Sequence, residues 1–228
     1  MTERYTNARA AAATDRVGGR QQVLATNSLI RNTYLLLSLT LAFSAVTAGA
    51  AVVTDAPRPN VFIVLGGYFG LLFLTQYLRN SAWGLASIFA LTGFMGYTLG
   101  PIINAYLGLP NGGQTVMTAF GGTAGIFVGL SAYALISRRD FSFLRGFLFA
   151  GILVAFLASL AGIFLQMPGL SLAVSVMFML LMSGLILYQT SEMVNGGEDN
   201  YIMATITLYV AIYNLFLSLL QLLGLANE

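Results

Sequence analysis

The amino-acid sequence predicts an all-α integral membrane protein with seven transmembrane helices. Of its 228 residues, 57% are apolar and only 8% are charged, and the charges leave long uncharged runs between them. The mean hydropathy is +0.81. A soluble domain carries about 25% charged residues to keep its surface hydrated. A membrane-spanning helix needs about 20 consecutive, mostly apolar residues, and the uncharged runs are long enough to supply them.

Each uncharged run fits one or two spanning helices. Two of the runs are too long for one helix, and each contains a turn sequence that divides it: Gly-Leu-Pro-Asn-Gly-Gly at 108–113 and Gln-Met-Pro-Gly at 166–169. A β-barrel would instead show alternating segments of about ten residues. The predicted helices cover residues 33–53, 61–78, 83–106, 114–136, 143–165, 170–190 and 202–224. They form one membrane domain over residues 32–228.

The arginines predict how the chain is oriented in the membrane, because positive charges near helix ends are retained in the cytoplasm. With the N-terminus inside, nine arginines lie on the inner side and only Arg58 lies outside. Seven spans then place the C-terminus on the outer side. The inner arginines are Arg4, Arg9, Arg16, Arg20, Arg31, Arg79, Arg138, Arg139 and Arg145.

Residues 1–31 are polar and rich in alanine and arginine, which predicts a disordered cytoplasmic tail. A secretory signal is the alternative, because Ala48-Gly49-Ala50 resembles a cleavage site. The long preceding segment and the long apolar run favour a retained first helix instead.

The absence of three residue types restricts the chemistry. The chain has no His and no Cys, and all ten of its positive charges are arginines. Without lysine no retinal Schiff base forms, and without histidine a Ser-His protease and His-ligated haem or zinc are excluded. We therefore expect no enzymatic activity, no catalytic residue, no cofactor, no metal site and no nucleic-acid partner.

The polar residues inside the predicted spans are neutral. Asn104, Gln189, Asn214 and Gln221 are the main ones, and every Asp and Glu lies in the tail, in a loop or at a helix end. Ionisable side chains within the bilayer typically mark ion pathways. Interhelical hydrogen bonding is therefore favoured over a substrate path.

Glycines four residues apart predict close helix packing in a compact bundle. The spacing occurs at Gly66-Gly70, at Gly96-Gly100 and, as a triple, at Gly121-Gly125-Gly129. An acidic loop, Glu192 to Asp199, is interpreted as a solvated loop, since its spacing matches no known cation-binding loop.

Several segments resemble the Bax inhibitor-1 family, and more narrowly its bacterial YccA branch. The similarity extends over roughly residues 31–224 without a large gap. It is carried by Arg31-Asn32-Thr33-Tyr34, the segments 38–45 and 93–104, Gly121-Gly122-Thr123-Ala124, Gly196-Gly197, Asn200-Tyr201-Ile202, Leu208-Tyr209 and Tyr213-Asn214. The resemblance implies a bundle in which six helices surround a central seventh, in the inner membrane of a bacterium.

The resemblance also implies a calcium leak gated by two aspartates on the sixth and seventh helices. In this chain those positions carry Gln189 and Ala211, and neither residue ionises. A carboxylate pair gates by titration, because two close like charges raise one of the two pKa values. The sequence therefore lacks the proton switch. An ungated cation path near Asn104, Gln189 and Asn214 remains the alternative function.

The YccA branch is associated with the membrane-anchored protease FtsH, as its substrate and its modulator. The favoured function is thus a non-enzymatic regulator that binds and inhibits FtsH, with HflK-HflC as further expected partners. The tail from Met1 to Arg20 is the candidate partner-binding segment, because a processive protease grips an unstructured end. A packed bundle that resists extraction from lipid would then occupy the protease.

Overall fold

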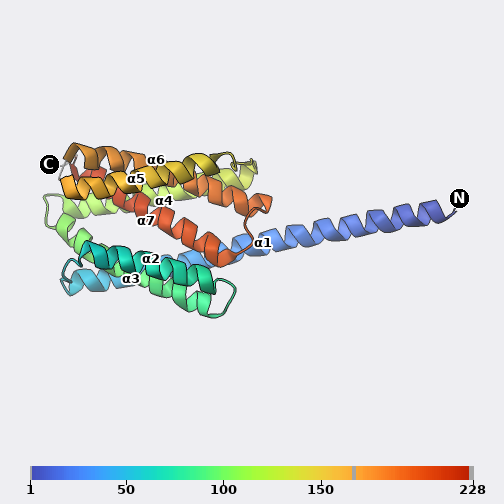
Figure 1. Cartoon of the computed structure of the whole chain (residues 1–228), viewed down its shortest axis with the longest axis horizontal. Coiled ribbons are helices and arrows are strands. Elements are labelled where there is room, and N and C mark those ends of the chain that lie inside the picture. Colours follow the sequence, from blue (N-terminus) through green and yellow to red (C-terminus); the bar gives the residue numbers. More distant parts are fainter. Residues whose placement is uncertain (1, 166–167, 226–228) are drawn as a thin grey trace.

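The computed structural model describes residues 2–165 and 168–225, and their side chains over 25–162 and 169–225. Its described residues form seven helices (Figure 1), and each of the seven has a segment long and apolar enough to cross a membrane. This confirms the predicted fold class. The helices are α1 (Thr2–Val53), α2 (Val61–Leu78), α3 (Trp83–Leu107), α4 (Gly112–Ser137), α5 (Leu144–Leu165), α6 (Pro168–Asn195) and α7 (Tyr201–Leu225).

The predicted helix bounds agree closely with the structure except at the start of the first helix and at the end of α6. The sequence ends this helix at residue 190, whereas the structure continues it to Asn195. Ser191 and Met193 are buried, so the additional turn packs inside the protein rather than fraying into solvent. The helix stops where Gly196 adopts a φ of +81°, the left-handed conformation that glycine supplies at helix ends.

The N-terminal segment is helical, which differs from the disordered tail that the sequence predicts. Helix α1 begins at Thr2, although its membrane-crossing part covers only Ala25–Val53. In Figure 1 the preceding part projects away from the bundle as a single rod. Alanine has the highest helix propensity, and the alanine run at 10–13 explains why this polar segment forms a helix.

The predicted partner-binding segment, Met1 to Arg20, lies in this helical part of the chain. From Thr2 onward it belongs to α1 and is helical rather than unstructured. Met1 itself lies outside the described residues, as do residues 226–228 at the end of the predicted membrane domain and residues 166–167 of the predicted turn before α6.

Helix α7 lies between two groups of helices, α1 to α3 on one side and α4 to α6 on the other (Figure 1). It packs against α1, α3, α4 and α6. Its buried residues recur along its whole length, from Ile202 to Gly224. Helix α2 is at the other extreme, with Thr75 as its buried residue. The structure thus has the central seventh helix that the resemblance implies.

The bundle has two ends, which we name for the rest of the description. The "tail end" contains the loops 79–82, 138–143 and 196–200 and the start of the spanning part of α1 at Ala25. The "C-terminal end" contains the loops 54–60 and 108–111 and the last residue of α7, Leu225. Nine arginines lie on the tail side, and Arg58 lies at the C-terminal end.

Helices α1 and α3 approach each other closely at two glycines. A Cβ atom added at Gly96 would overlap the backbone oxygen of Ser44 and the hydroxyl of Thr47. One added at Gly100 would overlap the Cβ of Ala51. Small residues at such crossings let two backbones meet, which supplies packing energy where lipid offers no hydrophobic driving force.

The other predicted glycine pairs do not pack inside the chain. Gly66 and Gly70 on α2, and the triple Gly121, Gly125 and Gly129 on α4, have no atom within 4 Å of an added Cβ. The spacing that predicts packing is therefore correct for α3 and wrong for α2 and α4. Helical spacing shows only that these glycines share one face of a helix, not that another helix covers that face.

We expect Gly96→Ala to lower the free energy of unfolding by about 2 kcal/mol, because the added methyl group must displace backbone. Gly125→Ala is the matched control, since its methyl group would enter open space. The control should unfold at the wild-type denaturant concentration or slightly above it, given the higher helix propensity of alanine. Unfolding by sodium dodecyl sulfate in mixed micelles measures both variants. Equal stability of the two would contradict the close α1–α3 contact.

Candidate functional site

The centre of the bundle contains a hydrogen-bonded tyrosine on α7. The Tyr209 hydroxyl donates to the backbone oxygen of Thr92 on α3, at 3.2 Å. It also lies 2.6 Å from the Ser44 hydroxyl on α1. A phenol has one proton, so Ser44 is the donor in the second bond. The side chain of Tyr209 is 1% exposed, and one hydroxyl group thus joins three helices inside the bundle.

The same face of α7 makes further polar contacts one turn above and one turn below Tyr209. The Thr205 hydroxyl lies 3.3 Å from the backbone oxygen of Thr33 on α1 and 2.7 Å from the Tyr201 backbone oxygen of its own helix. The Tyr213 hydroxyl lies 3.4 Å from the Thr98 hydroxyl on α3. The rings of Tyr209 and Tyr213 stack with centroids 6.3 Å apart. Residues 205, 209 and 213 recur at the i, i+4 spacing of one helix face. This pattern could have identified the polar face of α7 from the sequence, but only with the knowledge that α7 is central.

The two positions of the implied gate lie on neighbouring helices, α6 and α7, and both are buried. Gln189 is 5% exposed and Ala211 is 0% exposed. Ala211 packs in an apolar cluster with Ile186 and Leu215. Neither a glutamine nor an alanine side chain ionises, so this pair of positions has no group that could take up or release a proton. The structure therefore gives no support to a proton-gated leak through this pair.

Five buried polar atoms toward the tail end have no hydrogen-bond partner among the described residues. They come from α6 and from α1 and α4, which both pack against α6: Thr33 Oγ1, Tyr34 Oη, Ser131 Oγ, Gln189 Nε2 and Thr190 Oγ1. The Tyr34 and Phe127 rings, 6.1 Å apart, connect α1 to α4 one turn before Ser131. Buried polar groups generally obtain partners from protein or water. The arrangement suits neutral polar ligands such as water.

The predicted asparagine lining divides between two places. Asn104 lies near the C-terminal end, where its amide donates to the Val52 backbone oxygen at 3.2 Å and to Asp55 Oδ1 at 3.3 Å. Asn104 therefore caps the C-terminal end of α1 and ties it to α3. Asn214 lies near the middle of α7 and donates to the backbone oxygen of Val210 in its own helix, at 2.9 Å. Asn104 and Gln189 are near opposite ends of the bundle.

Side chains of α6 hold the loop between α4 and α5 at the tail end. The Ser191 hydroxyl donates to the Arg139 backbone oxygen at 3.0 Å and accepts from the Phe141 N–H at 3.0 Å. Asn195 donates to the same Arg139 oxygen at 3.4 Å. The hydrogen bonds from Ser191 and Asn195 thus fix the backbone of the loop that carries Arg138 and Arg139.

Asn200 anchors the start of α7 in a similar way. Its side-chain oxygen accepts from the N–H groups of Ile202 and Met203, which makes it a helix N-cap. Its amide donates to the Arg79 backbone oxygen at 3.1 Å and to the Asn80 side chain at 3.0 Å. The loop before α7 is thereby tied to the loop between α2 and α3.

Two carboxylates at the tail end, those of Asp140 and Glu198, accept hydrogen bonds from nearby backbone. Asp140 accepts from the Ser142 N–H at 2.8 Å, and this bond lowers the pKa of the Asp140 carboxyl. Glu198 accepts from the N–H groups of Asp199 and Asn200 within the acidic loop. Within residues 2–165 and 168–225 no group of three His, Cys, Asp or Glu residues is placed to hold a metal ion.

Comparison with known proteins places this geometry in a family. The family model described as "Inhibitor of apoptosis-promoting Bax1" matches residues 26–228. The chain belongs to that family. The match covers all seven membrane-crossing segments and confirms the resemblance to the Bax inhibitor-1 family.

Individual relatives match nearly the whole chain. An Escherichia coli protein named "Modulator of FtsH protease YccA" is 51% identical over 209 residues, which is 92% of this chain and 95% of that protein. An uncharacterized Pseudomonas aeruginosa protein is 60% identical over 88% of this chain and 90% of its own length. An uncharacterized membrane protein of Vibrio cholerae is 43% identical over 93% of this chain and 96% of its own length. The chain is thus a multi-pass membrane protein of the YccA branch.

We expect Tyr209→Phe to lower the free energy of unfolding by about 1 kcal/mol, because Ser44 and the Thr92 oxygen both lose a buried partner. Tyr133→Phe is the matched control, since Tyr133 is 46% exposed. Denaturant titration in mixed micelles measures the difference between the two variants. If Tyr209→Phe unfolds together with the control, the hydroxyl does not hold the three helices together.

Proposed function

We propose that this protein is a non-enzymatic membrane regulator that binds the protease FtsH, is degraded by it and thereby slows the degradation of other substrates. The observation that carries the proposal is the 51% identity, over 92% of the chain, to a protein named as a modulator of FtsH protease. Likeness over nearly the full length includes the bundle and not only one motif.

The N-terminal part of α1 supplies the segment that a protease would grip. It projects from the bundle in Figure 1, and an isolated helix without packing partners is only marginally stable in water. Unwinding it therefore requires little free energy. The alanine run at 10–13 maintains the helix, so the ease of unwinding is set by residues that can be exchanged without touching the bundle.

The bundle supplies the resistance to extraction. Pulling α1 would break the Ser44–Tyr209 bond and the close contacts at Gly96 and Gly100, and would draw polar backbone through lipid. A substrate that engages easily and is extracted slowly occupies the protease. Competitive inhibition follows from these two properties without any dedicated inhibitory site.

The orientation needed for this function agrees with the charge distribution. The arginines of the tail end would lie in the cytoplasm, which is the side from which a processive protease would pull the tail. We therefore propose an inner-membrane location with the N-terminus cytoplasmic and the C-terminus periplasmic. HflK-HflC are proposed as further partners on the same grounds of likeness.

We expect deletion of residues 2–20 to lengthen the cellular half-life of the protein several-fold in cells that contain FtsH, because the protease loses its starting segment. The half-life of a second FtsH substrate should shorten at the same time, since inhibition is relieved. In cells depleted of FtsH, the deletion should change neither half-life. Pulse-chase labelling of both proteins measures these effects.

A variant of unchanged length tests whether the ease of unwinding the N-terminal segment, rather than its length, sets the rate of degradation. Replacing the four alanines at 10–13 with glycine keeps the chain length and removes about 1 kcal/mol of helix propensity at each position. We expect this variant to be degraded faster than wild type. Unchanged half-lives for both variants, with FtsH present, would contradict the proposed role of the N-terminal segment.

A further inference from the structure

The C-terminal end of the bundle contains a pocket that the proposed function does not use. Its volume is about 410 Å³, within the range of small-molecule sites. Residues from four places in the chain line it: the loop before α2, the end of α3, the first turns of α6 and the end of α7. They are Arg58, Ala105, Tyr106, Leu109, Ser171, Gln221, Gly224 and Leu225.

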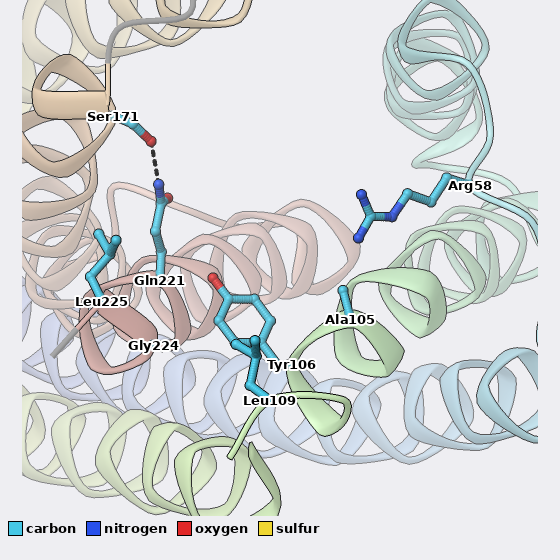
Figure 2. A pocket seen from close by; sticks show the side chains of 8 residues that line it. All are labelled: Arg58, Ala105, Tyr106, Leu109, Ser171, Gln221, Gly224 and Leu225. Atoms are coloured by element: carbon cyan, nitrogen blue, oxygen red, sulfur yellow. Dashed lines mark hydrogen bonds between the residues drawn. The ribbon is translucent and has the colours of Figure 1, made fainter. Parts of the chain in front are cut away.

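The polar groups converge on the pocket from opposite sides. Figure 2 shows the Arg58 guanidinium on one side, Ser171 and Gln221 on the other, and the Tyr106 hydroxyl directed into the space between them. Leu109 and Leu225 add apolar surface to the walls. The pocket thus combines convergent polar groups with apolar wall surface, as an amphiphilic ligand requires.

Hydrogen bonds orient the donors of Ser171 and Gln221. The Gln221 side-chain oxygen accepts from the Ser175 hydroxyl at 2.6 Å, and its amide donates to the Ser171 hydroxyl oxygen. An amide has a second N–H, and a hydroxyl that accepts a bond still has its own proton to donate. Ser171 and Gln221 therefore each offer a donor to a ligand from a fixed position.

Arg58 makes the pocket favour a negatively charged ligand. Helices α2 and α6 begin at this end whereas α3 and α7 end there, so their dipoles oppose one another. No described carboxylate makes an ion pair with Arg58, and the nearby acidic residue Asp55 accepts from Asn104 instead. The remaining charge is a guanidinium, which binds phosphate oxygens through two parallel hydrogen bonds.

Gly224 keeps the tyrosine wall in place. A Cβ atom added there would overlap the Cε1 atom of the Tyr106 ring. The ring therefore lies directly on the backbone of α7, and a larger residue would push it toward the pocket. This contact provides a way to change the shape of the pocket without changing its charge.

We propose that this pocket binds a singly charged phosphate ester, and that the phosphate is the head group of an anionic phospholipid. The level of the pocket supports the lipid source, because Arg58 lies between the end of the first span at Val53 and the start of the second at Val61. Phospholipid head groups lie at this level of a bilayer. A soluble phosphate ester has the same polar chemistry but would not use the apolar surface of Leu109 and Leu225.

The test is native mass spectrometry of the full-length protein in detergent, titrated with short-chain phosphatidylglycerol, short-chain phosphatidylcholine or glycerophosphoglycerol, the singly charged phosphatidylglycerol head group without its acyl chains. We expect phosphatidylglycerol to bind at least tenfold more tightly than the other two. Arg58→Gln should weaken that binding about tenfold, whereas Arg145→Gln, which removes an exposed arginine at the tail end, should leave it unchanged. Gly224→Ala should also weaken it, through the displaced ring.

Three results would overturn the proposal in different ways. Equal binding of glycerophosphoglycerol and phosphatidylglycerol, both sensitive to Arg58→Gln, would show a soluble phosphate ester as the ligand. Equal binding of phosphatidylcholine, insensitive to Arg58→Gln, would show that the pocket does not select charge. If none of the probes binds the full-length wild-type protein, and thermal unfolding shows that this protein is folded, the pocket has no phosphate site.

Discussion

The hydroxyl group of Tyr209 is the interaction on which the arrangement of the bundle most depends. Lipid chains are as apolar as the side chains they surround, so the helices gain little from leaving lipid for one another. Internal hydrogen bonds and close backbone contacts must therefore hold them together. Tyr209 bonds to Ser44 and to the Thr92 backbone, and so joins α7 to both α1 and α3. Around this point the glycines at 96 and 100 let α1 and α3 meet, and α7 contacts α4 and α6 on its other side.

The fold could be predicted from the sequence because lipid imposes a simple rule on it. Charges are costly in the middle of a span and collect near its ends, so their positions predict the number of helices and most of their bounds. Which faces meet is a different question, since it depends on tertiary contacts between segments distant in the chain. The triple glycine on α4 has the spacing of a packing stripe yet faces open space, while Thr205, Tyr209 and Tyr213, ordinary residues of an apolar helix, make its interhelical bonds. The helical N-terminal segment was missed because its low hydrophobicity outweighed its alanine content in the prediction.

The buried polar groups of the mainly apolar interior are neutral, which gives no support to a titratable ion path. Gln189 and Ala211 are buried where the family resemblance implies two carboxylates, so proton uptake there has no group to act on. The unpartnered hydroxyl and amide groups of α1, α4 and α6 suit water.

The two ends of the molecule differ sharply. The tail end has a projecting helix and most of the arginines, and the C-terminal end has a donor-lined pocket with one arginine. The tail end suits engagement by a membrane-anchored protease, and the C-terminal end suits a lipid head group.

The central claim is that the protein slows a membrane protease by engaging it easily and leaving the bilayer slowly. The most direct measurement uses purified FtsH in proteoliposomes with a fluorescent membrane substrate, and adds the full-length protein or the chain lacking residues 2–20. The account predicts that the full-length protein lowers the initial rate of substrate cleavage in proportion to its amount, and that the truncated chain does so far less. Cleavage at the same rate with and without the full-length protein would contradict it.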